Sequence, residues 1–169
     1  MLGENRQRLP LGGGPAGRLW PAMASIRVPT PLDLPPILER LSTSRSAALL
    51  LFFGSEDQAT GVSWCPDCVT ADPLLRRACR TLQPGRELIE CPVGSRSAWK
   101  NQPEHPYRLH PLIRLARIPT LIWVDSACER GRLVEADCAV PAIVEAFLRG
   151  SHSVGAGTAA PPPSAQRQA

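Results

Sequence analysis

A run of seven apolar residues, Ala47 to Phe53, is the strongest hydrophobic pattern in the chain. Continuous apolar runs of this length are typical of strands that are buried on both faces of a sheet. Four further strands are predicted, at Ser25 to Val28, Glu87 to Val93, Leu121 to Val124 and Leu133 to Glu135. Pro92 predicts that the strand over 87–93 ends or bends there.

Apolar residues near helical spacing predict helices over Pro31 to Leu41, Val69 to Leu82 and Val140 to Leu148, and a short helix is expected over Leu109 to Ala116. Between these elements, Gly54 to Ser63 is a long polar loop and Gln83-Pro84-Gly85 predicts a turn. The polar segment Asp125 to Arg132 contains Gly131 and predicts a hairpin turn. Residues 94–110, with several prolines, are expected to be mostly irregular.

The predicted order is β-α-β-α-β-α-β-β-α, a parallel start followed by an antiparallel hairpin. This order predicts an α/β protein with a mixed sheet between helices on both faces, in three α/β/α layers. The 169 residues, 43% of them hydrophobic, suit one domain of about 100–150 residues. We expect this domain at 25–150, between a disordered Gly/Pro/Arg-rich extension (1–24) and a disordered Gly/Ala/Pro-rich tail (151–169).

The motif Trp64-Cys65-Pro66-Asp67-Cys68 stands between the buried strand and the helix after it. A thiolate, not a thiol, attacks a disulfide, and the N–H groups and partial positive charge of a helix N-terminus favour the thiolate. The spacing predicts Cys65 as the nucleophile and Cys68, one turn later, as the resolving thiol of a dithiol/disulfide oxidoreductase. Pro66 fits the first helical turn, where its missing N–H is not needed.

Trp64, Pro66 and Asp67 are predicted to tune the redox properties of this dithiol. The Asp67 carboxylate opposes a nearby thiolate but stabilises a helix N-terminus, and we hypothesise that it sets the redox poise and discourages some partners. The alternative is half of a zinc site, which needs four ligands. The chain has no second C-x-x-C, and its candidate ligands His105 and His110 stand in a proline-rich stretch, so no metal site is predicted.

Ile118-Pro119-Thr120 comes directly before an apolar strand, where proline is unusual. Because the dithiol motif is also present, we predict a cis Ile118–Pro119 bond beside it, with a substrate strand pairing with the Ile118 backbone. An ordinary trans turn proline is the alternative.

The other cysteines, Cys79, Cys91, Cys128 and Cys138, are scattered singly, as is typical of reduced thiols in a reducing compartment. Cys79 and Cys91 are expected to be buried, and Cys128 or Cys138 is a candidate regulatory thiol. The net charge of +4 comes from dispersed residues, mostly arginine, which does not favour nucleic-acid binding. No apolar run is long enough for a membrane span.

The chain resembles the Clot family of thioredoxin-related proteins, also called thioredoxin domain-containing protein 17, within the thioredoxin superfamily. The resemblance covers residues 26–149 and is carried by Phe53-Gly54-Ser55, Ser63-Trp64-Cys65-Pro66-Asp67-Cys68-Val69, Cys91-Pro92-Val93-Gly94, Trp99-Lys100 and Ile118-Pro119-Thr120-Leu121. It implies a thioredoxin fold, with Cys65 as nucleophile, Cys68 as resolving thiol and Pro119 as the cis proline. It also implies that Ile118, Pro119 and Trp99 lie at the substrate site and that residues 54–63 narrow access to it.

The resemblance further implies a cytosolic protein-disulfide reductase that reduces small or selected disulfides such as cystine. Its electrons would come from NADPH through thioredoxin reductase, with no cofactor bound, and we expect a monomer. The alternatives are a redox-regulated binding module without turnover and a glutaredoxin-like enzyme. The Arg-rich segment 1–24 leaves organelle targeting as a second possibility, and Met23 is an alternative start.

Overall fold

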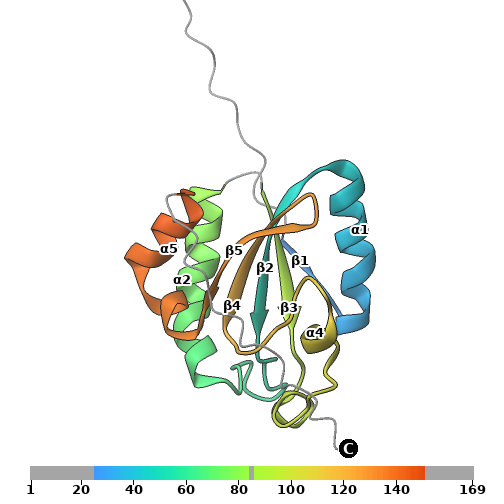
Figure 1. The fold of residues 1–169 in the computed structure, drawn as a ribbon. Helices are drawn as coiled ribbons and strands as arrows, with labels where there is room; N and C mark the ends of the chain where they lie inside the picture. Colours follow the sequence, from blue (N-terminus) through green and yellow to red (C-terminus); the bar gives the residue numbers. More distant parts are fainter. Residues whose placement is uncertain (1–24, 84–85, 151–169) are drawn as a thin grey trace, which may run out of the picture.

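A five-stranded sheet forms the centre of the protein (Figure 1). The computed structural model describes residues 25–83 and 86–150, and the strands follow the order β1-β3-β2-β4-β5. Their bounds are β1 Ser25–Arg27, β2 Ala47–Phe53, β3 Glu87–Pro92, β4 Thr120–Asp125 and β5 Cys128–Val134. Strands β1, β3 and β2 are parallel, whereas β4 is antiparallel to β2 and β5 to β4. The predicted mixed sheet is confirmed.

Helices cover both faces of this sheet, as the three-layer prediction requires. Figure 1 shows α1 (Leu34–Ser44) and the short α4 (Pro106–Leu109) on one side, with α2 (Pro66–Leu82) and α5 (Pro141–Leu148) on the other. Three further short helices are η1 (Pro31–Asp33), α3 (Arg96–Trp99) and η2 (Glu135–Ala139). The expected disorder of 1–24 and 151–169, and most of the expected turn at 83–85, lie outside the described residues.

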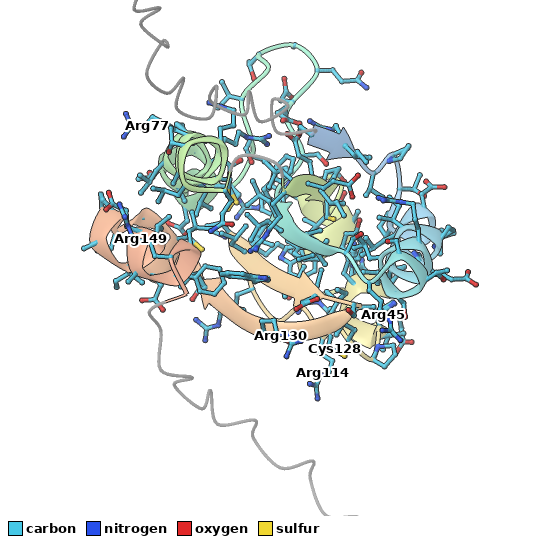
Figure 2. The ribbon with its side chains drawn as sticks, turned by 90° about the horizontal axis from the view of Figure 1, so that it is seen from above. Arg45, Arg77, Arg114, Cys128, Arg130 and Arg149 are labelled. Carbon is cyan, nitrogen blue, oxygen red and sulfur yellow. The ribbon has the colours of Figure 1, made fainter. Side chains whose placement is uncertain are left out.

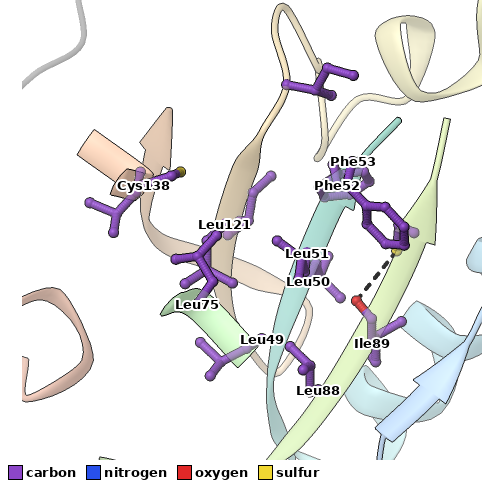
Figure 3. Close-up of a cluster of buried hydrophobic side chains, with 14 of the residues drawn as sticks. Leu49, Leu50, Leu51, Phe52, Phe53, Leu75, Leu88, Ile89, Leu121 and Cys138 are labelled. Atoms are coloured by element: carbon purple, nitrogen blue, oxygen red, sulfur yellow. Dashed lines mark hydrogen bonds between the residues drawn. The ribbon is translucent and has the colours of Figure 1, made fainter. Parts of the chain in front are cut away.

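Strand β2 is apolar along its whole length because it lies between two strands and two layers of helices. Its Leu50 pairs with Ile89 of β3 on one side and with Ile122 of β4 on the other. Figure 3 shows the strand surrounded by side chains of β3, β4 and α2, among them Leu88, Leu121 and Leu75, all at most 2% exposed. Strand β2 is buried from Ala48 to Phe53, and its carboxyl end is followed by the loop that leads to Cys65.

The prediction of a helix over 109–116 is wrong. The helical turn α4 ends at Leu109, and His110 is extended (φ −64°, ψ 126°). Pro111 explains this, because its ring disfavours the helical conformation for the residue before it. The chain then turns back, and the N–H of Leu115 donates to the carbonyl of Tyr107 at 2.9 Å. This compact turn brings residues 115–118 towards the motif.

The hairpin turn predicted within Asp125 to Arg132 is present, but it is shorter than that segment and does not use Gly131. The turn is at Ser126 and Ala127, both with positive φ (52° and 56°), as two-residue hairpin turns require. Strand β5 therefore begins at Cys128, and Gly131 lies inside it, beside a register shift near Trp123. The strand was predicted only over Leu133 to Glu135, because the first part of β5 is rich in charged residues, which protect sheet edges from pairing with other chains.

Burial of the single cysteines agrees with expectation for Cys79 and Cys91, both 0% exposed. Cys138 is buried as well, so of the two candidate regulatory thiols Cys128 is the exposed one. Figure 2 shows Cys128 on the outside of the protein, close to Arg130. None of the helices in the described part of the chain is long and apolar enough to cross a membrane.

Candidate active site

Cys65 is the N-cap of α2. Its backbone is extended (φ −97°, ψ 109°), Pro66 occupies the first helical position, and its Sγ accepts the N–H of Cys68 at 3.4 Å. Proline fits there because its nitrogen has no hydrogen to satisfy and its φ is already helical. The cysteine sulfur thus takes the place that a Ser or Asp side chain usually fills at a helix start.

The two motif thiols are in contact and have opposite electrostatic environments. The Cys68 thiol donates to Cys65 Sγ at 2.8 Å, and both cysteines are free. This hydrogen bond, helped by backbone N–H groups, lowers the pKa of Cys65 to about 7 against the opposing effects of burial and the Asp67 carboxylate. The same contact, together with burial, raises the pKa of Cys68 far above its ordinary value. Near pH 7 a large share of Cys65 is therefore thiolate, whereas Cys68 holds its proton.

Gly54 lets the Trp64-Cys65 segment approach the end of β2. A Cβ on Gly54 would lie 2.8 Å from Trp64 Cε2 and 3.0 Å from Cys65 Cβ. The indole is fixed, because Trp64 Nε1 donates to the Gly94 carbonyl at 2.8 Å. Ser63 Oγ donates to the Gly54 carbonyl at 2.6 Å, which holds the two ends of the loop together. Only glycine fits this approach. Its position directly after the apolar strand was visible in the sequence, but the reason for it is a tertiary contact.

The Ile118–Pro119 peptide bond is cis, as predicted. The Pro119 carbonyl accepts the N–H of Glu135 at 2.8 Å and the Cys138 thiol at 3.6 Å. Among residues 25–83 and 86–150, no hydrogen bond engages the backbone N–H or C=O of Ile118. The N–H and C=O of Ile118, which are predicted to pair with a substrate strand, therefore make no hydrogen bond to other described residues.

A cavity of about 410 Å³ opens beside Cys65. Six of the predicted site residues line it, namely Trp64, Cys65, Pro66, Asp67, Trp99 and Ile118. Cys68 and Pro119 are buried behind its wall, and residues 54–63 contribute nothing to its lining. The loop supports the motif instead, because the Ser55 carbonyl accepts the Trp64 N–H at 3.4 Å and Ser63 Oγ accepts the Cys65 N–H at 3.3 Å.

Seven lining residues were missed by sequence reasoning, namely Arg96, Lys100, Asn101, Arg108, Ala116, Arg117 and Glu135. Two of them, Lys100 and Arg117, could have been inferred from the sequence, because they are next to the predicted site residues Trp99 and Ile118. No local sequence pattern predicts that α3, α4 and the start of η2 lie beside the motif.

Trp99 is held in place by charged and aromatic neighbours. The Arg108 guanidinium lies over the indole, 3.7 Å from the ring centroid, and donates to the carbonyls of Leu115 and Ala116. The rings of Trp99 and His105 pack in a T-shaped arrangement, with their centroids 5.0 Å apart. Burial lowers the pKa of His105, so the imidazole is neutral. Its Nδ1 accepts the Tyr107 N–H at 3.2 Å and its Nε2 donates to the Val93 carbonyl at 3.1 Å.

Asp67 opposes the thiolate, as hypothesised, because its carboxylate raises the pKa of Cys65. We expect Asp67→Asn to lower the pKa of Cys65 by about half a pH unit, measured from the pH dependence of alkylation. Glu39→Gln, an exposed carboxylate on α1 across the sheet, is the matched control and should leave that pKa unchanged. An unchanged Cys65 pKa in Asp67→Asn would remove the tuning role.

Asp72 lies one turn after Cys68 on α2, and its Oδ1 is buried without a hydrogen-bond partner among the described residues. Burial raises the pKa of its carboxyl to about 6. Because the folded state holds this proton more tightly than the unfolded chain, the free energy of unfolding should fall as pH rises from about 4 to 6. The carboxyl is partly solvated, so Asp72→Asn is expected to stabilise the protein at pH 7.5 by about 1–2 kcal/mol. Urea unfolding at pH 4.5 and 7.5 tests this, and a variant that is no more stable at pH 7.5 contradicts it.

In the described part of the chain, no group of three or more His, Cys, Asp or Glu side chains converges as a metal site would require. His105 is engaged with Val93 and Tyr107, and the His110 Nδ1 accepts the Leu112 N–H at 3.3 Å.

Comparison with known proteins gives consistent results. The sequence model of a family described as thioredoxin domain-containing protein 17-like, thioredoxin domain, matches residues 32–150. The thioredoxin-like protein Clot of Arabidopsis thaliana is 34% identical over 110 residues, 64% of this chain and 81% of that protein. Thioredoxin domain-containing protein 17 of Homo sapiens is 37% identical over 91 residues, 50% of this chain and 71% of that protein.

Among solved structures, a reduced thioredoxin of Schistosoma mansoni superposes with a TM-score of 0.52 at 19% identity, covering 75% of this chain and 97% of the other. This likeness supports the thioredoxin fold alone. The family match spans most of the chain, and the identity to Clot extends over most of that relative. This chain therefore belongs to the thioredoxin domain-containing protein 17-like family of thioredoxin domains.

Proposed function

We propose that this protein is a disulfide reductase whose reactive group is the Cys65-Pro66-Asp67-Cys68 dithiol. Family membership supports thiol-disulfide oxidoreductase function in general. The reductase proposal itself rests on the hydrogen bond between the two thiols, whose sulfurs are 2.8 Å apart. This contact lowers the pKa of Cys65, and Cys65 is the thiol that lines the cavity. A thiol whose pKa is close to the ambient pH is the most effective attacking group in exchange.

In the proposed reaction, the Cys65 thiolate attacks one sulfur of a substrate disulfide. A mixed disulfide forms, and the other substrate sulfur leaves as a thiolate. Cys68 then loses its proton and attacks Cys65 Sγ, which releases the second substrate thiolate. Two electrons pass to the substrate, which becomes two thiols after taking up two protons, and the protein is left with a Cys65–Cys68 disulfide.

The contact between the thiols gives this sequence its order. The largest cause of the raised pKa of Cys68 is its hydrogen bond to Cys65. When Cys65 forms a mixed disulfide it is no longer an anion, so that contribution is lost and the Cys68 proton becomes easier to remove. The resolving thiol is thus held inactive until the first exchange has taken place.

Substrate would bind in the cavity beside Trp99 and pair with the backbone of Ile118, whose N–H and C=O no described residue engages. Extended chains commonly bind by pairing with an unused strand edge in this way. We further propose a cytosolic location, a monomer, and recharging by NADPH through thioredoxin reductase.

The test is reduction of cystine with NADPH and thioredoxin reductase as the sole electron donor. We expect NADPH consumption in proportion to the protein added. Cys128→Ser, which removes an exposed thiol away from the cavity, should retain it. A single stoichiometric oxidation without turnover would favour a redox-regulated binding module, and turnover only with glutathione and its reductase would favour a glutaredoxin-like enzyme. Either result would contradict the proposal.

A further inference from the structure

The cavity beside Cys65 has an excess of positive charge. Four cationic side chains line it, from Arg96, Lys100, Arg108 and Arg117, against the two carboxylates of Asp67 and Glu135. The four cations belong to three separate segments of the chain, which the fold brings together around the cavity.

Two of these cations are already engaged by the protein. Arg117 forms an ion pair with Glu135. Arg108 stacks on Trp99 and donates to two backbone carbonyls, so it fixes the wall between α4 and the residues before Pro119. The other two cations that line the cavity are Arg96 and Lys100.

Arg96 and Lys100 stand at the two ends of α3, around Trp99, and both are exposed. Within residues 25–83 and 86–150 neither makes a salt bridge or a side-chain hydrogen bond. Their charged groups are therefore available to a ligand that occupies the cavity.

We propose that this cavity selects small disulfides whose arms carry carboxylates, with a carboxylate directed to Arg96 and Lys100. This inference rests on the proposed reductase function. A carboxylate accepts charge-assisted hydrogen bonds from guanidinium and ammonium groups. Asp67, on the α2 side, disfavours a carboxylate at that wall, so the arm points to α3. A volume of about 410 Å³ lies within the range of about 300–1,000 Å³ for small-molecule sites.

The test is a single-turnover measurement with reduced protein and three disulfides of similar size: 3,3′-dithiodipropionate (dianion), bis(2-hydroxyethyl) disulfide (neutral) and cystamine (dication). One disulfide oxidises one Cys65–Cys68 pair and is converted to two thiols, so no external reductant is needed. Each rate is divided by the rate of the same disulfide with 2-mercaptoethanol, which corrects for its intrinsic reactivity. We expect the dianion to exceed the neutral disulfide by about three- to tenfold and the dication to be slowest, with the spread narrowing at 0.5 M salt.

In the Arg96→Gln/Lys100→Gln variant, the corrected rate with the dianion divided by that with the neutral disulfide is expected to fall most of the way to one. Its matched control, Arg77→Gln/Arg80→Gln, removes the same charge from two exposed residues near the far end of α2 and should keep that ratio. Figure 2 shows Arg77 pointing away from the protein body.

Equal corrected rates for the three disulfides, or an equal loss of the ratio in both variants, would overturn the inference while leaving the reductase intact. Failure of every disulfide to oxidise the pair would overturn the proposed function itself.

Discussion

Cys65→Ser is expected to abolish disulfide reduction, with a loss of at least about a hundredfold down to assay background. The serine hydroxyl does not ionise near pH 7, so no nucleophile remains in the cavity. Cys68→Ser should behave differently, because Cys65 still attacks but nothing resolves the product. The predicted result is one stoichiometric mixed disulfide on Cys65, detected by intact-protein mass spectrometry and removed by dithiothreitol.

The matched control is Cys128→Ser, since Cys128 is exposed and does not line the cavity. It should retain full turnover. Substantial turnover in Cys65→Ser, or a mixed disulfide located on another cysteine in Cys68→Ser, would show that the roles assigned to the two sulfurs are incorrect.

Gly54→Ala is expected to have the second largest effect, on both stability and reactivity. The added Cβ would meet the fixed indole of Trp64 at 2.8 Å and Cys65 Cβ at 3.0 Å, so the segment that carries the nucleophile must shift. Overpacking of this kind costs about 1–3 kcal/mol. We predict this loss in urea unfolding, together with slower alkylation of Cys65 at pH 7 as its contact with Cys68 is disturbed.

Gly61→Ala separates this packing effect from simple backbone strain. Gly61 has φ +67°, and a Cβ added to it would meet no atom within 4 Å, so the cost there comes from conformation alone. We expect a loss of about 1 kcal/mol with Cys65 reactivity unchanged. Equal Cys65 reactivity in the wild type and Gly54→Ala would mean that the close approach at Gly54 does not support the dithiol.

Elements with strong local patterns were predictable from the sequence. The bounds of β2 agree with its apolar run, and the position of Cys65 at the start of a helix followed from that strand and from the helical spacing of Val69 to Leu82. The failures have local causes as well. His110 is extended because Pro111 follows it, and the charged edge strand β5 has the composition of a loop.

The rest of the site depends on contacts between distant segments. Arg108 packs on Trp99 and binds the carbonyls of residues 115 and 116, an arrangement that no spacing rule predicts. The charge on Cys65 likewise depends on its 2.8 Å contact with Cys68. The motif suggests such a contact, but only the folded helix start sets its geometry.

In the proposed reaction, Cys65 attacks as a thiolate that is stabilised at the start of α2 by Cys68. Alkylation of reduced Cys128→Ser protein with iodoacetamide, followed from pH 5 to 10 with the site identified by mass spectrometry, measures it directly. We predict a midpoint for Cys65 near pH 7 that rises in Cys68→Ala, where the donor hydrogen bond is lost. A midpoint at about 8.5, the value of an ordinary cysteine, in both proteins would contradict the account.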